Sequence, residues 1–222
     1  MSARDLGSGV LHLPLTPLSG INAYHADGVL FDAGTRQSAK SILRALAGRD
    51  LDAHALTHAH PDHQGASHAV CTARGAPFWV GDADADVAEG TAPTSIPDHW
   101  VNGLIGAVWT GPPHPVDRRL TEGDTVGRFV VLETPGHSDG HVVFWDDRDG
   151  ILILGDVLRN LSYATLRPGL REPPTAFTPD PGQNRTSARR LVGLRPRLVL
   201  FGHGPPLRDP DAFDAFLRAL PT

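Results

Sequence analysis

Short apolar runs separated by turn residues fill the first part of the chain. Three of these runs have the length and apolar content of β-strands. Asp27-Gly28 separates the last two, and this pair favours the tight turn of a β-hairpin. The pattern therefore predicts three strands, the last two forming a hairpin, at residues 10–15, 21–26 and 28–34.

The apolar spacing then alternates between that of helices and that of strands. Residues 38–48 predict an amphipathic helix that ends at Gly48. Its apolar face consists of Ala39, Ile42, Leu43 and Leu46. The following segments predict a buried strand that runs into a loop, a helix preceded by Pro61, and a further strand, at residues 51–60, 62–73 and 76–81.

From residue 82 to residue 119 the periodic pattern is lost. The segment is rich in Pro and Gly, yet it contains Trp100 and Trp109. Long irregular connections inside a domain commonly cover a binding site. We therefore expect an ordered pocket loop with a short helix, in which the two tryptophans either wall the pocket or anchor the loop.

Strands and helices return in the second half of the chain. The predicted strands lie at 128–136, 141–147, 150–156 and 197–204, and the predicted helices at 184–194 and 209–220. Residues 157–182 predict a second, Pro-containing pocket loop. Strands followed by helices in both halves indicate one domain of α/β class over residues 1–222 rather than two domains.

Composition narrows the classes of function. The 222 residues carry a formal net charge of −5, which argues against a nucleic-acid-binding protein, because such proteins cluster Lys and Arg. No run approaches the roughly 18 apolar residues of a membrane span. The first residues do not resemble a signal peptide, and Cys71 is the only cysteine. We expect a cytoplasmic protein that binds neither nucleic acid nor membranes.

Candidate metal ligands are concentrated in "THAHPDH", residues 57–63. His58 and His60 are two apart in an extended segment, so their side chains point to the same side. Asp62 and His63 follow at the turn into the predicted helix, where they can offer two further ligands. Imidazole and carboxylate are ligands that Zn²⁺ accepts.

Three more such residues each follow a strongly apolar strand and a glycine. They are His137, Asp156 and His203. A lone histidine at a strand end is more often a hydrogen-bonded or surface residue, and Asp156 could equally serve as a turn residue or helix cap. The coincidence of all seven positions is much harder to explain in that way. The joint pattern therefore favours a metal site.

These motifs resemble those of the metallo-β-lactamase-fold superfamily. "HAHPDH" matches the H-x-H-x-D-H signature, and "TPGH", "LILGD" and "FGHG" follow in the family's order, after an early "LFDAG". The likeness extends from about residue 20 to residue 205. It implies a four-layer αββα sandwich with the metal site at one edge of two mixed sheets.

The resemblance also implies a ligand set for two Zn²⁺ ions per chain. One ion would be held by His58, His60 and His137, the other by Asp62, His63 and His203, and Asp156 would bridge them. Iron or manganese could replace zinc, because the same ligand types suit them. The histidine at position 60 argues against the di-iron, oxygen-reducing branch, which has a glutamate there.

Two cations held close together would bind a bridging water as hydroxide, so the implied ligand set predicts a hydrolase that uses this nucleophile. Asp62 would orient this nucleophile, and Tyr163 would donate to the substrate oxyanion or else only pack against the pocket. Asp32 would support a ligand imidazole or serve as a turn residue, and His141 would hydrogen-bond within the site or begin a strand.

The loops rather than the fold determine the substrate. The lack of a signal peptide disfavours a secreted β-lactamase, the 19 residues after His203 disfavour glyoxalase II, and the acidic composition disfavours nucleic-acid processing. We expect a hydrolase of a small ester, thioester or lactone, which could form a homodimer. Two alternatives remain open: a mononuclear iron enzyme resembling persulfide dioxygenases, and a non-catalytic metal-binding protein of the same fold.

Overall fold

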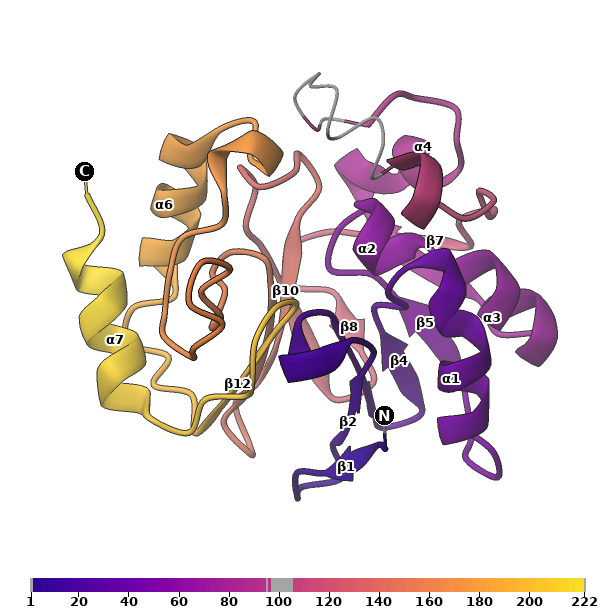
Figure 1. Ribbon diagram of the computed structural model, residues 1–222, viewed down its shortest axis with the longest axis horizontal. Coiled ribbons are helices and arrows are strands. Elements are labelled where there is room, and N and C mark those ends of the chain that lie inside the picture. Colours follow the sequence, from indigo (N-terminus) through magenta and orange to yellow (C-terminus); the bar gives the residue numbers. More distant parts are fainter. Residues whose placement is uncertain (1, 95, 97–105, 222) are drawn as a thin grey trace.

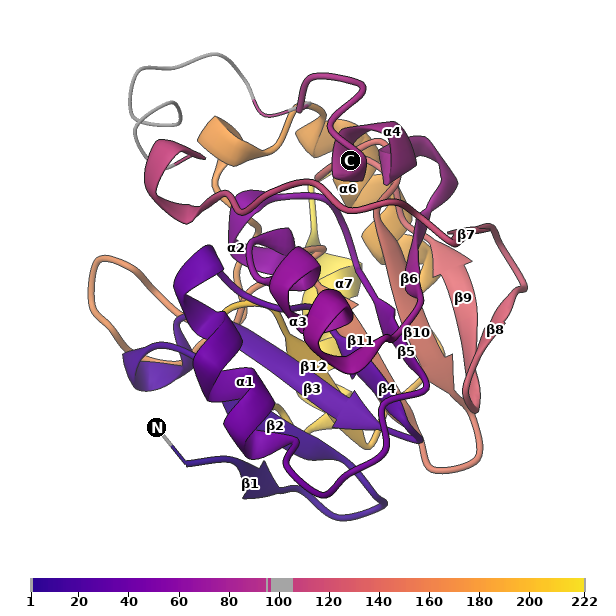
Figure 2. The same cartoon turned by 90° about the vertical axis from the view of Figure 1, so that its right-hand side faces the viewer.

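Two mixed β-sheets lie face to face, with helices on both outer sides, in the computed structural model (Figures 1 and 2). The structure describes residues 2–94, 96 and 106–221. Figure 1 shows α1 and α3 on one flank and α6 and α7 on the other, with the sheets between them. The predicted four-layer αββα sandwich is therefore confirmed. In the described part of the chain, no helix has the length and apolar character needed to cross a membrane.

The first sheet is antiparallel over its first four strands and parallel over the rest. Asp27 and Gly28, both at positive φ, make the predicted hairpin turn. The strands run in the order β1 (Arg4–Asp5), β2 (Leu11–Pro14), β3 (Asn22–Ala26), β4 (Val29–Phe31), β5 (Ala53–Ala55), β6 (Phe78–Gly81) and β7 (Arg118–Leu120).

The second sheet has four antiparallel strands and one strand, β12, that pairs in parallel with β11. Its order is β12 (Leu198–Phe201), β11 (Ile151–Gly155), β10 (Val142–Asp146), β9 (Phe129–Glu133) and β8 (Thr125–Val126). The sequence pattern does not predict β1, β7 or β8, because these two- or three-residue strands, unlike β4 and β5, do not lie within a longer apolar run.

Alternate residues of the strands fill the space between the two sheets. Phe31 of β4 meets Phe129 and Phe144 of the second sheet, with ring centroids 5.2 and 4.8 Å apart. The intervening residues face outward and pack under the helices: Leu30 contacts the layer of α1 and α3, and Val143 contacts that of α6 and α7. Both faces of these strands are therefore buried, and a shift by one residue would exchange the side chains packed between the sheets with those packed under the helices.

The longer helices cover these outer faces. Asp180 and Asp209 cap the two C-terminal helices, each accepting a 2.8 Å hydrogen bond from a backbone N–H three residues later. The helices are α1 (Ala39–Ala45), α2 (Pro61–Gln64), α3 (Ser67–Arg74), α4 (Ala85–Ala88), α6 (Pro181–Arg190) and α7 (Pro210–Ala219). Single 3₁₀ turns are η1 (Pro17–Ser19), η2 (Arg36–Ser38), η3 (Asp82–Asp84) and η4 (Thr175–Phe177).

Two sequence predictions need correction. The helix predicted over 62–73 is two helices, α2 and α3, because Ala66 leaves the helical conformation after Gly65. A Cβ on Gly65 would lie 2.5 Å from the carbonyl oxygen of Trp109, so the close approach of that segment requires glycine here. The segment 82–119 is not irregular throughout, since it begins with η3 and α4, has a helical turn at 106–109 and ends in β7.

Candidate metal centre

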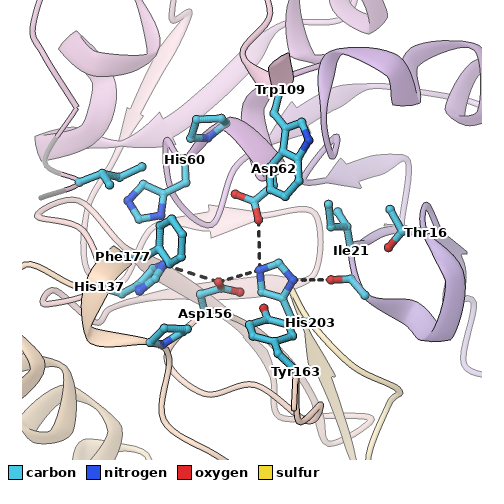
Figure 3. A pocket seen from close by; sticks show the side chains of 14 residues that line it. Thr16, Ile21, His60, Asp62, Trp109, His137, Asp156, Tyr163, Phe177 and His203 are labelled. Carbon is cyan, nitrogen blue, oxygen red and sulfur yellow. Dashed lines mark hydrogen bonds and ion pairs between the residues drawn. The ribbon is translucent and has the colours of Figure 1, made fainter. Parts of the chain in front are cut away.

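Seven candidate ligands meet where the strands of both sheets end. Figure 3 shows the five of them that line the cavity: His60, Asp62, His137, Asp156 and His203. The chain leaves β5 in an extended conformation that carries His58 and His60, and Pro61 then begins α2. This short helix carries the last two residues of the motif, and loops after β9, β11 and β12 bring the other three. The distant residues of the sequence pattern thus lie beside the motif.

The ligand atoms form three overlapping groups, within each of which they lie no more than 4.8 Å apart. The groups are His58, His60 and His137; Asp62, His63 and His203; and His58, His63 and Asp156. The Asp156 carboxylate lies between the first two groups, 3.5 Å from Nε2 of His137 and 3.0 Å from Nε2 of His203. This is the placement that a bridging carboxylate requires.

The histidine rings are oriented by hydrogen bonds at Nδ1. His58 bonds to the Thr57 hydroxyl at 3.0 Å, His137 to the Thr178 hydroxyl at 3.0 Å, and His203 to the Gly20 carbonyl. The other ring nitrogens then face one another across the centre. Second hydrogen bonds of this kind fix the orientation of metal-binding imidazoles.

Four of these inward-facing nitrogens are buried without a hydrogen-bond partner among the described residues. They are Nε2 of His58, His60, His63 and His137. A buried nitrogen left unpaired costs about 1–3 kcal/mol. Convergence of four such atoms is unfavourable unless a cation accepts their lone pairs, so the residues present fit bound metal.

The charges of the centre fit the same interpretation. Burial lowers the pKa of His58 and His137 well below the ordinary value, which leaves neutral rings that can donate a lone pair. Burial also acts to lower the pKa of His63, but Asp156 and Asp32 outweigh it and raise the pKa to about 10. Without a cation, the carboxylates thus draw protons onto neighbouring imidazoles, and bound metal would take the place of those protons.

Glycines allow the close approach of the strand ends. A Cβ on Gly202 would lie 2.1 Å from Oδ1 of Asp156 and 2.5 Å from Cε1 of His63. Gly155 has φ +54°, and a Cβ there would lie 2.7 Å from the Thr57 side chain. Any larger residue at these two positions would displace candidate ligands or their supports.

Asp32 lies beneath the ligands. Its Oδ2 accepts a 2.8 Å hydrogen bond from Nδ1 of His63, and its Oδ1 accepts one of 2.8 Å from the backbone N–H of Thr57. The sequence left open whether this residue supports an imidazole or only makes a turn. In the structure Asp32 supports the His63 imidazole, and its backbone also has the positive φ, 58°, that is common in turns.

His141 is not part of any candidate ligand group. Its Nε2 accepts a 3.1 Å hydrogen bond from the backbone N–H of Asp156, and its Nδ1 lies 2.8 Å from the Thr134 hydroxyl. Burial lowers the pKa of His141 to about 3, so the ring stays neutral and Nε2 remains an acceptor. The residue holds the loop that carries Asp156.

Asp84 is a supporting residue that the sequence analysis missed. Its buried carboxylate accepts hydrogen bonds from the backbone N–H groups of Ala59 and Gly140, both at 2.8 Å, and from the Ser138 hydroxyl at 2.7 Å. These donors flank His58, His60 and His137. No local signal distinguishes it in "DADADVAE", where three aspartates alternate with alanines.

A cavity of about 350 Å³ opens over the centre. Trp109 lines it from the segment 82–119, and Tyr163 and Phe177 line it from the segment 157–182. A third wall, which the sequence did not predict, comes from Thr16, Gly20 and Ile21 between β2 and β3. Trp100, the other predicted pocket residue, lies outside the described residues.

Sequence and structure comparisons with known proteins agree on one family. The model of the metallo-beta-lactamase superfamily matches residues 21–203. The probable metallo-hydrolase YflN of Bacillus subtilis is 30% identical over 201 residues, which cover 81% of this chain and 76% of that protein. A hydroxyacylglutathione hydrolase of Bdellovibrio bacteriovorus is 27% identical, and the match covers 78% of this chain but 56% of that protein.

Among solved structures, TTHA1623 in a di-iron-bound form is 31% identical with a TM-score of 0.66. The alignment covers 89% of this chain and 93% of that one. The family match spans the early "LFDAG" segment and all seven candidate ligands, from His58 to His203. The chain therefore belongs to the metallo-beta-lactamase superfamily.

Proposed function

We propose that this metal-dependent hydrolase holds two divalent cations, zinc in the first instance, and cleaves small esters, thioesters or lactones. His58, His60 and His137 would hold one ion, Asp62, His63 and His203 the other, and Asp156 would contact both. The observation that carries the proposal is the convergence of four buried Nε2 atoms, none of which makes a hydrogen bond among the described residues, around a carboxylate that lies between the two groups. Two ligand groups of this composition suit two ions better than one.

Two bound cations would supply a hydroxide at neutral pH and polarise the substrate carbonyl. The chain itself supplies the remaining functions. Asp62 lines the cavity, with its carboxylate 3.2 Å from Nε2 of His203. The carboxylate can therefore accept a hydrogen bond from the nucleophile and orient the nucleophile toward the substrate. Burial acts to raise the pKa of Asp62, but the effect of His203 and His63 is larger and brings the pKa below its ordinary value. The carboxylate is therefore ionised.

Tyr163 is the candidate donor to the developing oxyanion. Its ring lines the cavity with its centroid 6.0 Å from that of His203. Burial raises the pKa of the Tyr163 hydroxyl, which therefore keeps its proton at neutral pH and can donate a hydrogen bond. A donor aimed at the oxyanion lowers the barrier of acyl transfer more than it strengthens substrate binding.

The substrate class is supported by the cavity and by the relatives. A volume of about 350 Å³ accommodates a small molecule. A related hydroxyacylglutathione hydrolase is, by its name, a thioester hydrolase. Esters and lactones present the same kind of carbonyl to the same nucleophile.

The decisive experiment is metal analysis of the purified protein combined with a panel of substrate classes. We expect two zinc ions per chain and turnover of at least one ester, thioester or lactone. One iron per chain with sulfite formation from glutathione persulfide would instead favour a dioxygenase. Iron is included in the analysis because the related TTHA1623 has been solved in a di-iron-bound form. Metal-replete protein that turns over no compound of the panel would favour a non-catalytic metal-binding role.

A further inference from the structure

The cavity above the metal centre is apolar apart from the centre itself. Besides the candidate ligands and Gly20, its polar lining consists of Thr16 and Tyr163. The apolar lining residues are Ile21, Pro61, Ile96, Trp109, Pro174 and Phe177 (Figure 3). Among the described residues, no lysine or arginine lines this cavity.

The sequence outside the described residues adds no lysine or arginine between Thr94 and Gly106. Residues 95 and 97–105 contain neither Lys nor Arg. The only lysine of the chain is Lys40, within α1 on the outer face of the first sheet. A negatively charged substituent in the cavity would therefore have to approach the metal ions or remain unpaired.

Arg159 contacts one lining residue, Tyr163, but its guanidinium is already engaged. Its guanidinium stacks on the ring of Tyr163, 4.4 Å from the ring centroid. It also donates to the backbone carbonyl of Glu172 at 3.1 Å and to that of Leu161. These contacts hold the guanidinium behind the tyrosine rather than in the cavity.

The positive charge of the proposed centre would lie at the metal ions and not at the far end of the cavity. Asp62 and Asp156 would offset about half of the charge of two divalent cations. An anionic group on the far end of a substrate would face Ile21, Trp109 and Phe177 instead. Moving a carboxylate from water to such surroundings is strongly unfavourable, whereas an alkyl chain or aromatic ring gains from the same transfer.

We infer that the cavity selects an uncharged ester, thioester or lactone with an apolar acyl group and rejects substrates with a carboxylate or phosphate on that group. The inference rests on the proposed hydrolase function and narrows it. In a hydroxyacylglutathione the carboxylates belong to the thiol part and the acyl group is uncharged, so the inference concerns the acyl side alone and does not conflict with the name of that relative.

Hydrolysis of two matched esters tests the inference. Phenyl hexanoate and monophenyl adipate have the same leaving group and a six-carbon acyl chain, and they differ in a terminal methyl or carboxylate. We expect kcat/KM of the zinc-replete protein to be at least about tenfold higher for the hexanoate. Equal values, or a preference for the adipate, would overturn the inference.

A binding measurement separates this inference from the proposed function. Hexanohydroxamic acid and adipic acid monohydroxamate share a metal-binding group and differ in the same terminal group. Calorimetry should show at least about tenfold tighter binding of the hexanoic compound, whether or not the protein turns over either ester. Equal affinities would overturn the inference even if hydrolysis is found, whereas selective binding without turnover of any ester, thioester or lactone would count only against the hydrolase proposal.

Substitutions that add an arginine to the cavity wall provide the reciprocal test. Thr16→Arg should raise the adipate-to-hexanoate ratio of kcat/KM at least about tenfold above that of Thr16→Gln, which changes the same wall without adding a charge. Phe177→Arg on another wall, compared with Phe177→Met, which keeps that wall apolar, repeats the test should the first variant fold poorly. An unchanged ratio in both arginine variants, each shown to be folded and to bind metal, would contradict the inference.

Discussion

The Asp84 carboxylate accepts a 2.8 Å hydrogen bond from the backbone N–H of Ala59, the residue that separates His58 from His60. The same carboxylate accepts from Ser138 and Gly140, in the loop that carries His137. One buried side chain therefore connects the two segments that form the first ligand group. It acts through the backbone and contacts no candidate metal position itself.

Asp84→Asn should weaken metal binding while preserving the overall size of the side chain. An amide has one acceptor oxygen, so at least one of the three donors must face an N–H group instead. We expect metal affinity to fall about 10–100-fold, as for other groups that support metal ligands. Competition with a chromogenic chelator measures it.

Asp86→Asn is the matched control for this change. Asp86 belongs to the same acidic run but is exposed and forms an ion pair with Arg119 on the surface. Its metal affinity should equal that of the unmodified chain, because surface ion pairs contribute little. Unchanged affinity in Asp84→Asn as well would show that Asp84 does not position the ligand segments.

The contrast between Asp84 and the ligands shows what the sequence could predict. Four candidate ligands lie in one heptapeptide and the other three each follow an apolar strand, so local pattern predicts all seven residues that the structure brings together. Asp84 becomes a supporting residue only through partners 25 to 56 positions away, and no period in its own segment indicates which aspartate is buried.

The same distinction applies to the fold. The strands that pack between the sheets show clear apolar runs, and the sequence predicts them. The close approach of the Trp109 carbonyl to Gly65, beside the break between α2 and α3, and the third cavity wall, where η1 meets the loops of the second sheet, both bring together distant segments. Contacts of this kind are tertiary, and one sequence carries no local signal for them.

His60→Ala should remove one metal ion and the activity together. His60 belongs to the first ligand group alone, so its loss leaves His58 and His137 as an incomplete site. We expect metal content to fall from two ions to about one per chain and kcat to fall at least about 100-fold. Elemental analysis and steady-state kinetics of the same preparation give both values.

His68→Ala is the control for loss of a histidine. His68 lies on α3 and contacts His114 rather than any ligand. Metal content and activity should stay at the level of the unmodified chain. Two ions and full activity in His60→Ala would disprove the ligand assignment.

Tyr163→Phe should lower kcat and leave metal binding unchanged. The substitution removes the hydroxyl but keeps the ring that stacks on Arg159, so the cavity wall is preserved. Loss of an oxyanion donor costs about 10²–10³ in kcat. We expect KM and metal content to stay within about twofold of the unmodified values; a normal kcat would assign Tyr163 a packing role only.

His54 makes the stability of the fold depend on pH below neutrality. The ring is fully buried, with Nδ1 3.0 Å from the Leu30 carbonyl and Nε2 2.8 Å from the Ser67 hydroxyl. Burial lowers the pKa of His54 to about 4, against about 6.5 for an unfolded chain. Between these values the unfolded state binds more protons, so the free energy of unfolding falls as pH falls from about 6.5 to about 4.

The loss should amount to about 3 kcal/mol for this one residue. Urea unfolding of the metal-free protein at pH 7 and pH 4.5, compared with His54→Gln, isolates it, because all other histidines are common to both chains. His54→Gln should be less stable at pH 7, since it loses the fit between Leu30 and Ser67, yet it should lose less stability on acidification. Equal losses in the two chains would show that the buried imidazole is not the group that takes up the proton on unfolding.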